Sequence, residues 1–360
     1  MVIAVFLILL YCLSILGLIY GFTNIKEYTI PHSTPKTKFT IIVPFRNETE
    51  NLPHLLESIS QLDYPTHLFE VILVDDESGE KFSVSSFKFQ VHLIDNKRVS
   101  NSPKKDAIVT AMQMVTTDWV ITTDADCTVP KNWLLTLDQY IQNNTVQMIA
   151  GAVSYECQNS FLHHFQQLDL SSLQGATIGS FGLGNGFMCN GANLAYSKAF
   201  FQELKGFEGN DSIASGDDVF LLQKAIAYTP DQVHYLKSND NIITTKPLDN
   251  WKSVFHQRVR WAAKTSSYKS DFGKGLGLVV FTGNLAIILG FFFLNLWVIV
   301  SLFLLKISVD TVLIMQSNRF LNYKPKYLIA SSILYPFWSV SVALFSLLGK
   351  YEWKGRHFEK

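Results

Sequence analysis

The chain has 360 residues, of which 48% are hydrophobic and 17% are charged. Its 30 basic and 30 acidic side chains give a formal net charge of zero, which argues against the basic surface typical of nucleic-acid-binding proteins. The mean hydropathy of +0.16 is too high for an ordinary soluble protein and too low for one buried wholly in a membrane. Length and composition therefore predict one sizeable folded domain combined with membrane segments.

The N-terminal segment is apolar. Residues 2–22 contain no charged side chain, and about 20 such residues suffice for a helix to cross the hydrocarbon core. A cleaved signal peptide would begin with a basic residue and have a shorter apolar stretch, so we predict an uncleaved transmembrane anchor over residues 1–23. Lys26, Lys36 and Lys38 follow the anchor and, by the positive-inside rule, place the next segment in the cytoplasm.

Residues 24–250 show the pattern of an α/β domain. Three apolar runs rich in β-branched residues (39–44, 71–74 and 119–123) predict buried strands, and helical apolar spacing over 51–62 predicts a helix. Strands that alternate with helices favour a mostly parallel sheet, with ligands bound beyond the carboxyl ends of its strands. The four cysteines show no CxxC pair and no metal-finger spacing, which is typical of free thiols in a reducing compartment such as the cytoplasm.

Membrane segments return towards the C-terminus. Residues 251–274 are expected to form an amphipathic helix at the membrane interface. Residues 275–305 carry no charge and are too many for one untilted span, so we expect Asn295 to mark a turn between two helices. With one further apolar segment, two or three transmembrane helices are predicted within 275–349, followed by a basic tail over 350–360.

The charges around the last apolar segment do not decide between two and three helices. Basic residues stand on both sides of it, and both groups compete for the cytoplasmic face. They are Arg319, Lys324 and Lys326 before the segment, and Lys350, Lys354 and Arg356 after it.

Two predicted strands end in paired carboxylates. Asp75 and Asp76 stand where side chains of an open α/β sheet can hydrogen-bond a nucleotide, although Asp-Asp-Glu-Ser-Gly is equally good turn chemistry. Asp124 and Asp126 can converge on one hard cation such as Mn²⁺ or Mg²⁺, which takes oxygen ligands and bridges phosphates. An Asp-x-Asp pair alone is a weak signal, because about one is expected by chance at this composition.

A third acidic pair, Asp217 and Asp218, opens an apolar helix. Helix capping explains it, because carboxylates stabilise a helix N-terminus. The functional alternative is a general base, because adjacent carboxylates repel each other and raise the proton affinity of one of them. Taken alone, this feature favours capping.

A basic and aromatic motif, Gln257-Arg258-Val259-Arg260-Trp261, precedes the membrane segments. On a helix, Gln257, Arg260 and Trp261 share one face. A guanidinium beside an indole suits a ligand that carries both phosphate and sugar. It also suits an amphipathic helix lying on a membrane, and both interpretations can hold together.

In this order, the motifs resemble those of the family 2 glycosyltransferases of GT-A fold, the membrane group that includes cellulose, chitin and hyaluronan synthases and ceramide glucosyltransferase. The resemblance covers about residues 39–265 and rests on Ile41-Ile-Val-Pro-Phe-Arg-Asn-Glu48, Asp75-Asp76, Asp124-Ala-Asp126, Gly216-Asp-Asp218 and Gln257-Arg-Val-Arg-Trp261. It implies an α/β fold: a nucleotide-diphospho-sugar transferase domain with a mostly parallel central sheet, plus transmembrane helices at both ends.

The resemblance also implies roles by position. Asp75 and Asp76 would bind the nucleoside of the donor. Asp124 would bind its phosphates together with Lys104 or Lys105, although a solvated basic turn explains these lysines about as well. Asp124 and Asp126 would hold a divalent cation, Mn²⁺ or Mg²⁺. Asp218 would be the catalytic base, with Asp217 beside it. The residues expected at the diphosphate and acceptor are Gln257, Arg258, Arg260 and Trp261, and the loop residues Cys189, Gly191 and Asn193.

Two features depart from the family pattern. Many relatives carry Glu where this chain has Asp217, a change that keeps the charge. The C-terminal membrane part is small for enclosing a polysaccharide channel, which argues against a secreting polymerase.

The sequence therefore predicts an inverting, membrane-bound glycosyltransferase of the hexosyltransferase type. Its donor would be a nucleotide sugar, by resemblance a UDP-sugar, and its acceptor a lipid or lipid-linked glycan; no nucleic-acid partner is expected. The expected location is the bacterial inner membrane, with the catalytic domain in the cytoplasm. A processive polysaccharide synthase and a non-catalytic, transferase-like membrane scaffold are the alternatives.

Overall fold

A computed structural model describes residues 2–29, 33–84, 86–210, 216–347, 350–353 and 356–359. The chain divides into two compact units. The membrane unit comprises Met1–Ile25, Tyr155–Phe187 and Pro247–Lys360, and the sheet unit comprises Lys26–Ser154 and Met188–Lys246. Residues 155–187 were expected within the catalytic domain but group with the membrane segments instead.

The sheet unit is built on a seven-stranded sheet with the order β3-β2-β1-β4-β8-β6-β9. Strands β3, β2, β1 and β4 run parallel, whereas β8 is antiparallel to both of its neighbours. The strands are β1 Phe39–Phe45, β2 Phe69–Asp75, β3 Gln90–Asp95, β4 Trp119–Thr122, β6 Met148–Ala150, β8 Leu194–Ser197 and β9 Val233–Tyr235. The predicted strands at β1, β2 and β4 are confirmed, as is the mostly parallel sheet.

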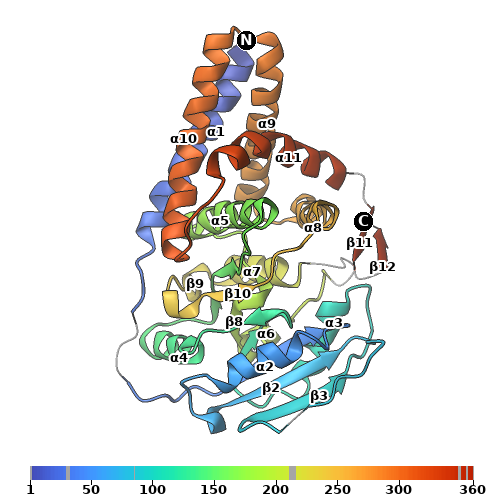
Figure 1. Cartoon of the computed structure of the whole chain (residues 1–360). Coiled ribbons are helices and arrows are strands. Elements are labelled where there is room, and N and C mark those ends of the chain that lie inside the picture. The colour runs from blue at the N-terminus through green and yellow to red at the C-terminus, as the bar shows by residue number, and fades with distance from the viewer. Residues whose placement is uncertain are drawn as a thin grey trace. The chain divides into compact units, whose positions relative to one another are not determined.

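Shorter elements complete this unit (Figure 1). Its helices are α2 Leu52–Ser60, α3 Pro103–Met112, α4 Trp133–Asn143, α6 Lys198–Glu203 and α7 Asp217–Tyr228. A second sheet pairs β5 Cys127–Thr128 and β7 Val153–Tyr155 with β10 Ile243–Thr245 between them. The predicted helix over residues 51–62 corresponds to α2.

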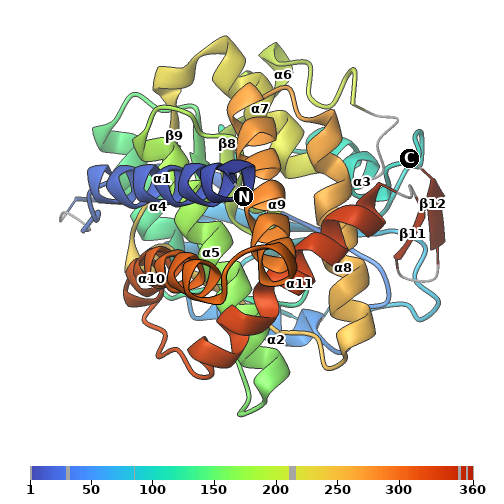
Figure 2. The same ribbon diagram turned by 90° about the horizontal axis from the view of Figure 1, so that it is seen from above.

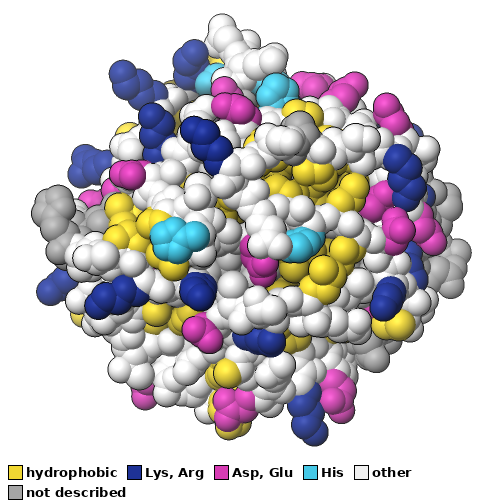
Figure 3. All heavy atoms as spheres, turned by 90° about the horizontal axis from the view of Figure 1, so that it is seen from below, with side chains coloured by type: hydrophobic (Ala, Val, Ile, Leu, Met, Phe, Trp, Pro, Cys, Tyr) yellow, Lys and Arg dark blue, Asp and Glu magenta, His cyan; other side chains and the backbone are white. Residues whose placement is uncertain are grey.

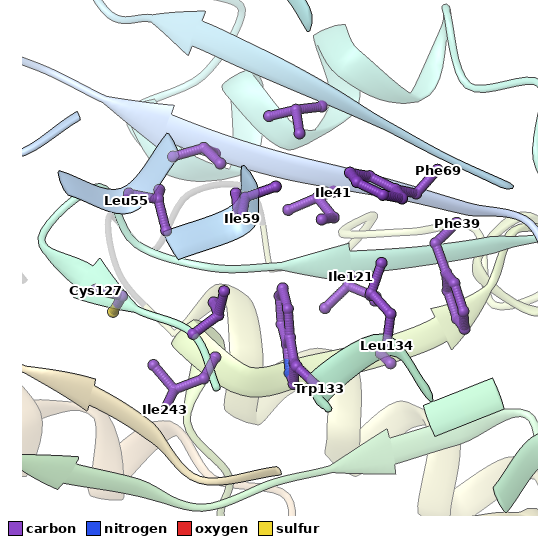
Figure 4. Close-up of a cluster of buried hydrophobic side chains, with 14 of the residues drawn as sticks. Phe39, Ile41, Leu55, Ile59, Phe69, Ile121, Cys127, Trp133, Leu134 and Ile243 are labelled. Atoms are coloured by element: carbon purple, nitrogen blue, oxygen red, sulfur yellow. The ribbon is translucent and has the colours of Figure 1, made fainter. Parts of the chain in front are cut away.

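The core of the sheet unit lies between the parallel strands and the helices packed on them (Figure 4). Strands covered on both faces must be apolar on both faces, and Phe39, Ile41 and Ile42 of β1 are all fully buried. Trp133 of α4 is also fully buried, and its indole N–H donates to Asn193 Oδ1 at 3.1 Å. The apolar runs of the sequence thus form the centre of the fold.

The membrane unit contains four helices long and apolar enough to cross a membrane. They are α1 Val2–Asn24, α9 Asp271–Phe293, α10 Leu296–Phe320 and α11 Leu328–Ser346, and the unit also contains α5 Phe161–Gly182 and α8 Trp251–Ala263. Helices α1, α9 and α10 lie side by side (Figures 1 and 2). The chain is therefore an integral membrane protein.

The expected turn at Asn295 is confirmed, because Asn295 caps α10 by accepting a hydrogen bond from Trp297 N at 2.9 Å. The expected start of α9 is displaced by four residues. Ser270 caps this helix through a hydrogen bond from Gly273 N at 3.1 Å, so Asp271 and Lys274 fall within its first turn. As a result, the helix predicted over residues 251–274 ends at Ala263.

Helix α5 joins the membrane unit through glycines. A Cβ atom built on Gly21 of α1 would lie 2.1 Å from the Gly179 carbonyl oxygen, and one on Gly182 of α5 would lie 1.8 Å from the Gly21 carbonyl oxygen. One turn earlier on the same face of α5, Gly175 faces Ser317 and Leu313 of α10. Small residues at such spacing let two helix backbones touch, which explains why α5 belongs with the anchor.

The predicted basic tail forms a two-stranded hairpin, β11 Lys350–Trp353 and β12 Arg356–Glu359. Lys354 lies outside the described residues. Figure 3 shows a face of the molecule that carries both acidic and basic side chains, in keeping with the formal net charge of zero.

Candidate active site

The loop after β2 is organised by Asp75. Its carboxylate accepts a hydrogen bond from Ser78 N at 2.8 Å and one from Lys81 Nζ at 3.0 Å. Burial alone would raise the pKa of Asp75, but the Ser78 hydrogen bonds and the Lys81 ammonium hold this pKa below its ordinary value. Asp75 is therefore an ionised residue that shapes a turn, which is the structural interpretation considered for it from the sequence.

Asp76 lies between basic side chains at the same edge of the sheet. Its carboxylate accepts a hydrogen bond from Asn96 Nδ2 at 2.7 Å. Arg98 Nη1 lies 3.5 Å and Arg46 Nη1 lies 3.8 Å from its oxygens. The side chain is only 6% exposed and is held in one orientation by groups that follow β1 and β3, the two strands beside its own.

Asp106 of α3 fixes the loop that carries Arg98, a role that the sequence did not suggest. Asp106 Oδ2 accepts hydrogen bonds from Arg98 Nε at 3.3 Å, from Val99 N at 3.1 Å and from Ser100 N at 3.0 Å. Asp106 is buried, and its carboxylate oxygens are satisfied there by the hydrogen bonds from this loop. The position of Arg98 beside Asp76 thus depends on α3.

Lys104 joins two of the predicted acidic motifs. Its ammonium lies 2.7 Å from Asp124 Oδ1 and 3.4 Å from Asp217 Oδ2. Burial alone would lower the pKa of Lys104, but the carboxylates of Asp124, Asp217 and Asp218 outweigh burial and raise this pKa. Three carboxylates thus gather around one ammonium, an arrangement that suits the binding of a further cation.

Asp218 is held at the start of α7. Gly216 precedes the helix with a φ of +84°, a left-handed conformation that suits glycine. Asp218 Oδ1 accepts a hydrogen bond from Val219 N at 2.7 Å, and Oδ2 accepts one from Gly191 N at 3.0 Å. A Cβ atom on Gly191 would lie 3.1 Å from Asp217 Oδ2 and 3.3 Å from Lys104 Nζ, so glycine is needed for this close packing.

The Gln257–Trp261 motif lies on α8 in the membrane unit. Arg258 is buried; its Nε donates to Asp169 Oδ2 at 2.5 Å and its Nη1 donates to Gln257 Oε1 at 2.5 Å. Its guanidinium lies 4.2 Å from the centre of the Trp261 ring. Burial alone would lower the pKa of Arg258, but Asp169 outweighs burial and raises it.

The fixed guanidinium beside the indole therefore belongs to Arg258, whereas the sequence analysis expected Arg260 to provide it. The reason is geometric. Arg258 and Trp261 are three residues apart on the helix, and Asp169 of α5 holds Arg258 in place.

A comparison with known protein families matches most of the sheet unit together with residues 155–187 of the membrane unit. Residues 40–205 match the family described as Glycosyl transferase family 2. This part of the chain is a family 2 glycosyltransferase domain. The match covers β1, β2 and β4 together with Asp76, Lys104, Asp124 and Gly191.

Two individual proteins resemble the chain. One is an undecaprenyl-phosphate 4-deoxy-4-formamido-L-arabinose transferase of Yersinia enterocolitica, 34% identical over 94 residues that make up 25% of this chain and 29% of that protein. The chain thus matches less than a third of this relative's length. The other is the solved structure of a mannosyltransferase of Pyrobaculum calidifontis in complex with GDP-Man and Mn²⁺, with a TM-score of 0.58, 16% identity, and coverage of 96% of this chain and 99% of that one. The second likeness supports the GT-A fold of the family 2 domain.

Two predicted site residues of the family 2 domain have other contacts, and a third is buried. Lys105 is buried, and its Nζ donates to the Asn210 carbonyl at 2.5 Å. Asn193 differs from its expected place at the acceptor, because its amide is buried and bonded to Trp133, Ala152 and Asn241. Cys189 is buried as well.

The cation expected at Asp124 and Asp126 has suitable ligands. The two carboxylates flank the buried Ala125 and are both partly exposed, and carboxylate oxygens are what Mn²⁺ and Mg²⁺ prefer. Within the described part of the chain, no cluster of three or more His, Cys, Asp or Glu residues offers a complete protein cage. Asp124 and Asp126 therefore fit a divalent cation.

Proposed function

We propose that this protein is a membrane-bound glycosyltransferase that moves a sugar from a nucleotide-diphosphate donor, preferably a UDP-sugar, to a lipid or a lipid-linked glycan. The observation that carries the proposal is the position of Lys104 between Asp124 and Asp217, beside Asp218. This arrangement brings together the lysine at position 104, the Asp124–Asp126 motif and the Asp217–Asp218 motif, which lie far apart in the sequence. A site of this charge suits a diphosphate together with a divalent cation.

The proposed reaction is an inverting single displacement. Asp218 accepts the proton of an acceptor hydroxyl while that oxygen bonds to the anomeric carbon of the sugar and the bond to the diphosphate breaks. The hydrogen bonds that Gly191 N and Val219 N donate to the Asp218 carboxylate keep it oriented for this step. Lys104 stabilises the charge of the departing diphosphate. Asp124 and Asp126 would hold Mn²⁺ or Mg²⁺, which adds electrostatic stabilisation of the same leaving group.

The remaining residues are assigned to binding. Asp75 and Asp76 form the nucleoside end of the site, Asp75 by shaping its loop and Asp76 together with Arg46 and Arg98 by direct contact. Gly191 lies at the acceptor, where its N–H donates to Asp218. The residues assigned to the diphosphate and acceptor are Cys189, Gln257, Arg260 and Trp261, with Arg258 positioning Gln257 and Trp261.

The membrane helices support a lipid acceptor. A membrane anchor gives no advantage for a soluble acceptor, and the name of the Yersinia relative refers to undecaprenyl phosphate. Lys26, Lys36 and Lys38 follow α1 and support a cytoplasmic catalytic domain by the positive-inside rule. We place the protein in a bacterial inner membrane on these grounds.

The test is sugar transfer by the detergent-purified protein. UDP-, GDP- and dTDP-sugars are supplied with Mn²⁺ or Mg²⁺ and a membrane-lipid extract, and labelled product is followed into the lipid phase. We expect one donor to label a lipid, and Asp126→Ala to abolish the labelling. A ladder of long chains would instead indicate a processive synthase. A folded protein that binds and cleaves no donor would indicate a non-catalytic scaffold.

A further inference from the structure

Helix α11 differs in direction from the other apolar helices of the membrane unit. Helices α1, α9 and α10 lie side by side, whereas α11 lies crosswise over α5 and α8 in both views (Figures 1 and 2). It packs against α8, α9 and α5. Its length of 19 residues corresponds to about 28 Å, so it could cross the hydrocarbon core only if it stood nearly upright.

One face of α11 packs against two helices, α5 and α8, that do not cross the membrane. The Trp338 ring lies 5.4 Å from Phe165 of α5, and 5.7 Å and 5.5 Å from Trp251 and Phe255 of α8, measured between ring centres. Helix α8 is too polar to be a span, since Lys252, Arg258 and Arg260 all lie within its 13 residues. Because α11 packs on α8 through this face, it lies at the level of α8.

The opposite face of α11 is apolar and exposed. Ile329, Ile333 and Phe337 are 75%, 51% and 53% exposed, and their spacing of four residues places them on one side of the helix. Leu344 extends the exposed apolar surface towards the end of the helix. We call these four residues the α11 stripe. Exposed apolar surface of this kind marks a membrane contact when it adjoins transmembrane helices.

Basic residues flank α11 at both ends. Lys324 and Lys326 precede it, and Lys326 Nζ donates to Asn159 Oδ1 at 3.1 Å, which ties the start of α11 to the start of α5. Lys350 follows the helix, with Lys354 and Arg356 next in the sequence. A helix that crosses the membrane would place one of these basic groups on the outer side, against the positive-inside rule. A helix that does not cross places both on the same side.

We infer that α11 lies in the surface of the bilayer on the side at which α1 ends, with the α11 stripe in the acyl chains and with Lys324 and Lys326 at lipid phosphates. Within the described residues, the chain then crosses the membrane at α1, α9 and α10. Its C-terminus and the segment after α1 share one side. This inference is independent of the proposed transfer reaction.

The first test maps the C-terminus. A C-terminal epitope on the full chain is exposed to protease in sealed vesicles of one orientation, and cleavage of the family 2 domain reports its side. We expect the epitope and the domain to be digested from the same side. Protection of the epitope under conditions that digest the domain would overturn the inference. A second epitope inserted at the α9–α10 turn should show the opposite protection and serves as the control.

The second test measures the depth of the α11 stripe. Single cysteines at Ile329, Ile333, Phe337 and Leu344, in a background that lacks the native cysteines, carry nitroxide labels. Accessibility to oxygen and to a water-soluble nickel complex then gives their depths in vesicles. A surface helix predicts similar shallow depths at all four positions. A steady change through the membrane centre from Ile329 to Leu344 would contradict the inference, whatever the activity of the protein.

Discussion

Lys104 and Asp124 of the sheet unit and Arg258 and Asp169 of the membrane unit form ion pairs of contrasting burial. The side chains of the first pair are 23% and 41% exposed, and those of the second are 5% and 7% exposed. The first pair has a further carboxylate, Asp217, at 3.4 Å. In a partly exposed cluster with more carboxylates than ammonium groups, a ligand can replace one of the ionic contacts at little cost. Removing one member of a buried pair leaves the other charge buried and destabilises the protein.

A second buried ion pair of the membrane unit lies on the transmembrane helix α10. Lys306 and Asp310, one turn apart on α10, form a pair at 2.6 Å, and Tyr11 of α1 donates to Asp310 at 2.7 Å. Lys306 is almost fully buried. Charged residues in transmembrane helices face the bundle interior and pair with each other. We therefore interpret these ion pairs of the membrane unit as structural and the Lys104–Asp124 pair of the sheet unit as functional.

The largest expected effect comes from breaking the buried pair. Asp169→Ala leaves the Arg258 guanidinium buried without its carboxylate and should reduce the free energy of unfolding by about 3–5 kcal/mol. Thermal unfolding in detergent measures this loss. The double variant Asp169→Leu with Arg258→Met removes both charges and should recover most of the stability. A single variant as stable as the wild type would show that the pair is not structural.

The next largest effect concerns the glycine contact between α1 and α5. Gly21→Ala places a methyl group against the Gly179 carbonyl and should destabilise the membrane unit by about 1–3 kcal/mol. Gly17→Ala on the same helix is the matched control, because no atom lies within 4 Å of its added Cβ. It should be neutral, or stabilising by up to about 1 kcal/mol through helix propensity. Equal melting temperatures for the two variants would refute the close contact.

In the sheet unit, by contrast, Lys104→Met should cost activity rather than stability. Loss of one charged group that stabilises a leaving group typically reduces kcat by about 10²–10³-fold. The partial exposure of the pair limits its contribution to stability to about 1 kcal/mol or less. Transfer rates and melting temperature measured on one preparation test both statements. Lys105→Met should show the reverse pattern, because Lys105 is buried against Asn210 and Phe220.

The smallest expected effect is a dependence on pH. The pKa of Asp75 is lower in the folded protein than in the unfolded chain, so its contribution to stability is complete above the unfolded pKa, about 3.9. The contribution decreases as the pH falls through the folded pKa. Lys81→Met should therefore reduce stability slightly at pH 7, and the difference from wild type should vanish at strongly acid pH. A difference that grew on acidification would contradict this sign.

Local patterns in the sequence predicted the parts of the fold that depend on neighbouring residues. The β-branched runs became β1, β2 and β4, and Asn295 became the turn between α9 and α10. The pairing of Lys104 with Asp124 and Asp217 was only partly predictable, because the analysis named the residues without their contacts. The pattern of apolar and polar residues along a chain predicts which positions are buried. It does not predict which side chains from distant parts of the sequence are in contact.

The missed features involve long-range contacts. Asp169 and Arg258 are 89 residues apart, and neither position reveals its partner. The membership of α5 in the membrane unit had a signal, the Gly175-x-x-x-Gly179 spacing that is typical of close helix pairs. Polar residues such as Gln166 and Asp169 obscured that signal by making the segment look like part of a soluble domain.

The central claim, that Asp218 is the base of a metal-assisted sugar transfer, is tested most directly by separating binding from chemistry. Donor binding by calorimetry with Mn²⁺ or Mg²⁺, and release of nucleotide in the presence of lipid acceptor, are measured for wild type and for Asp218→Asn. We predict that the variant binds the donor within a few-fold of wild type and releases nucleotide about 10²–10⁴-fold more slowly. A folded Asp218→Asn variant with undiminished release would contradict the account.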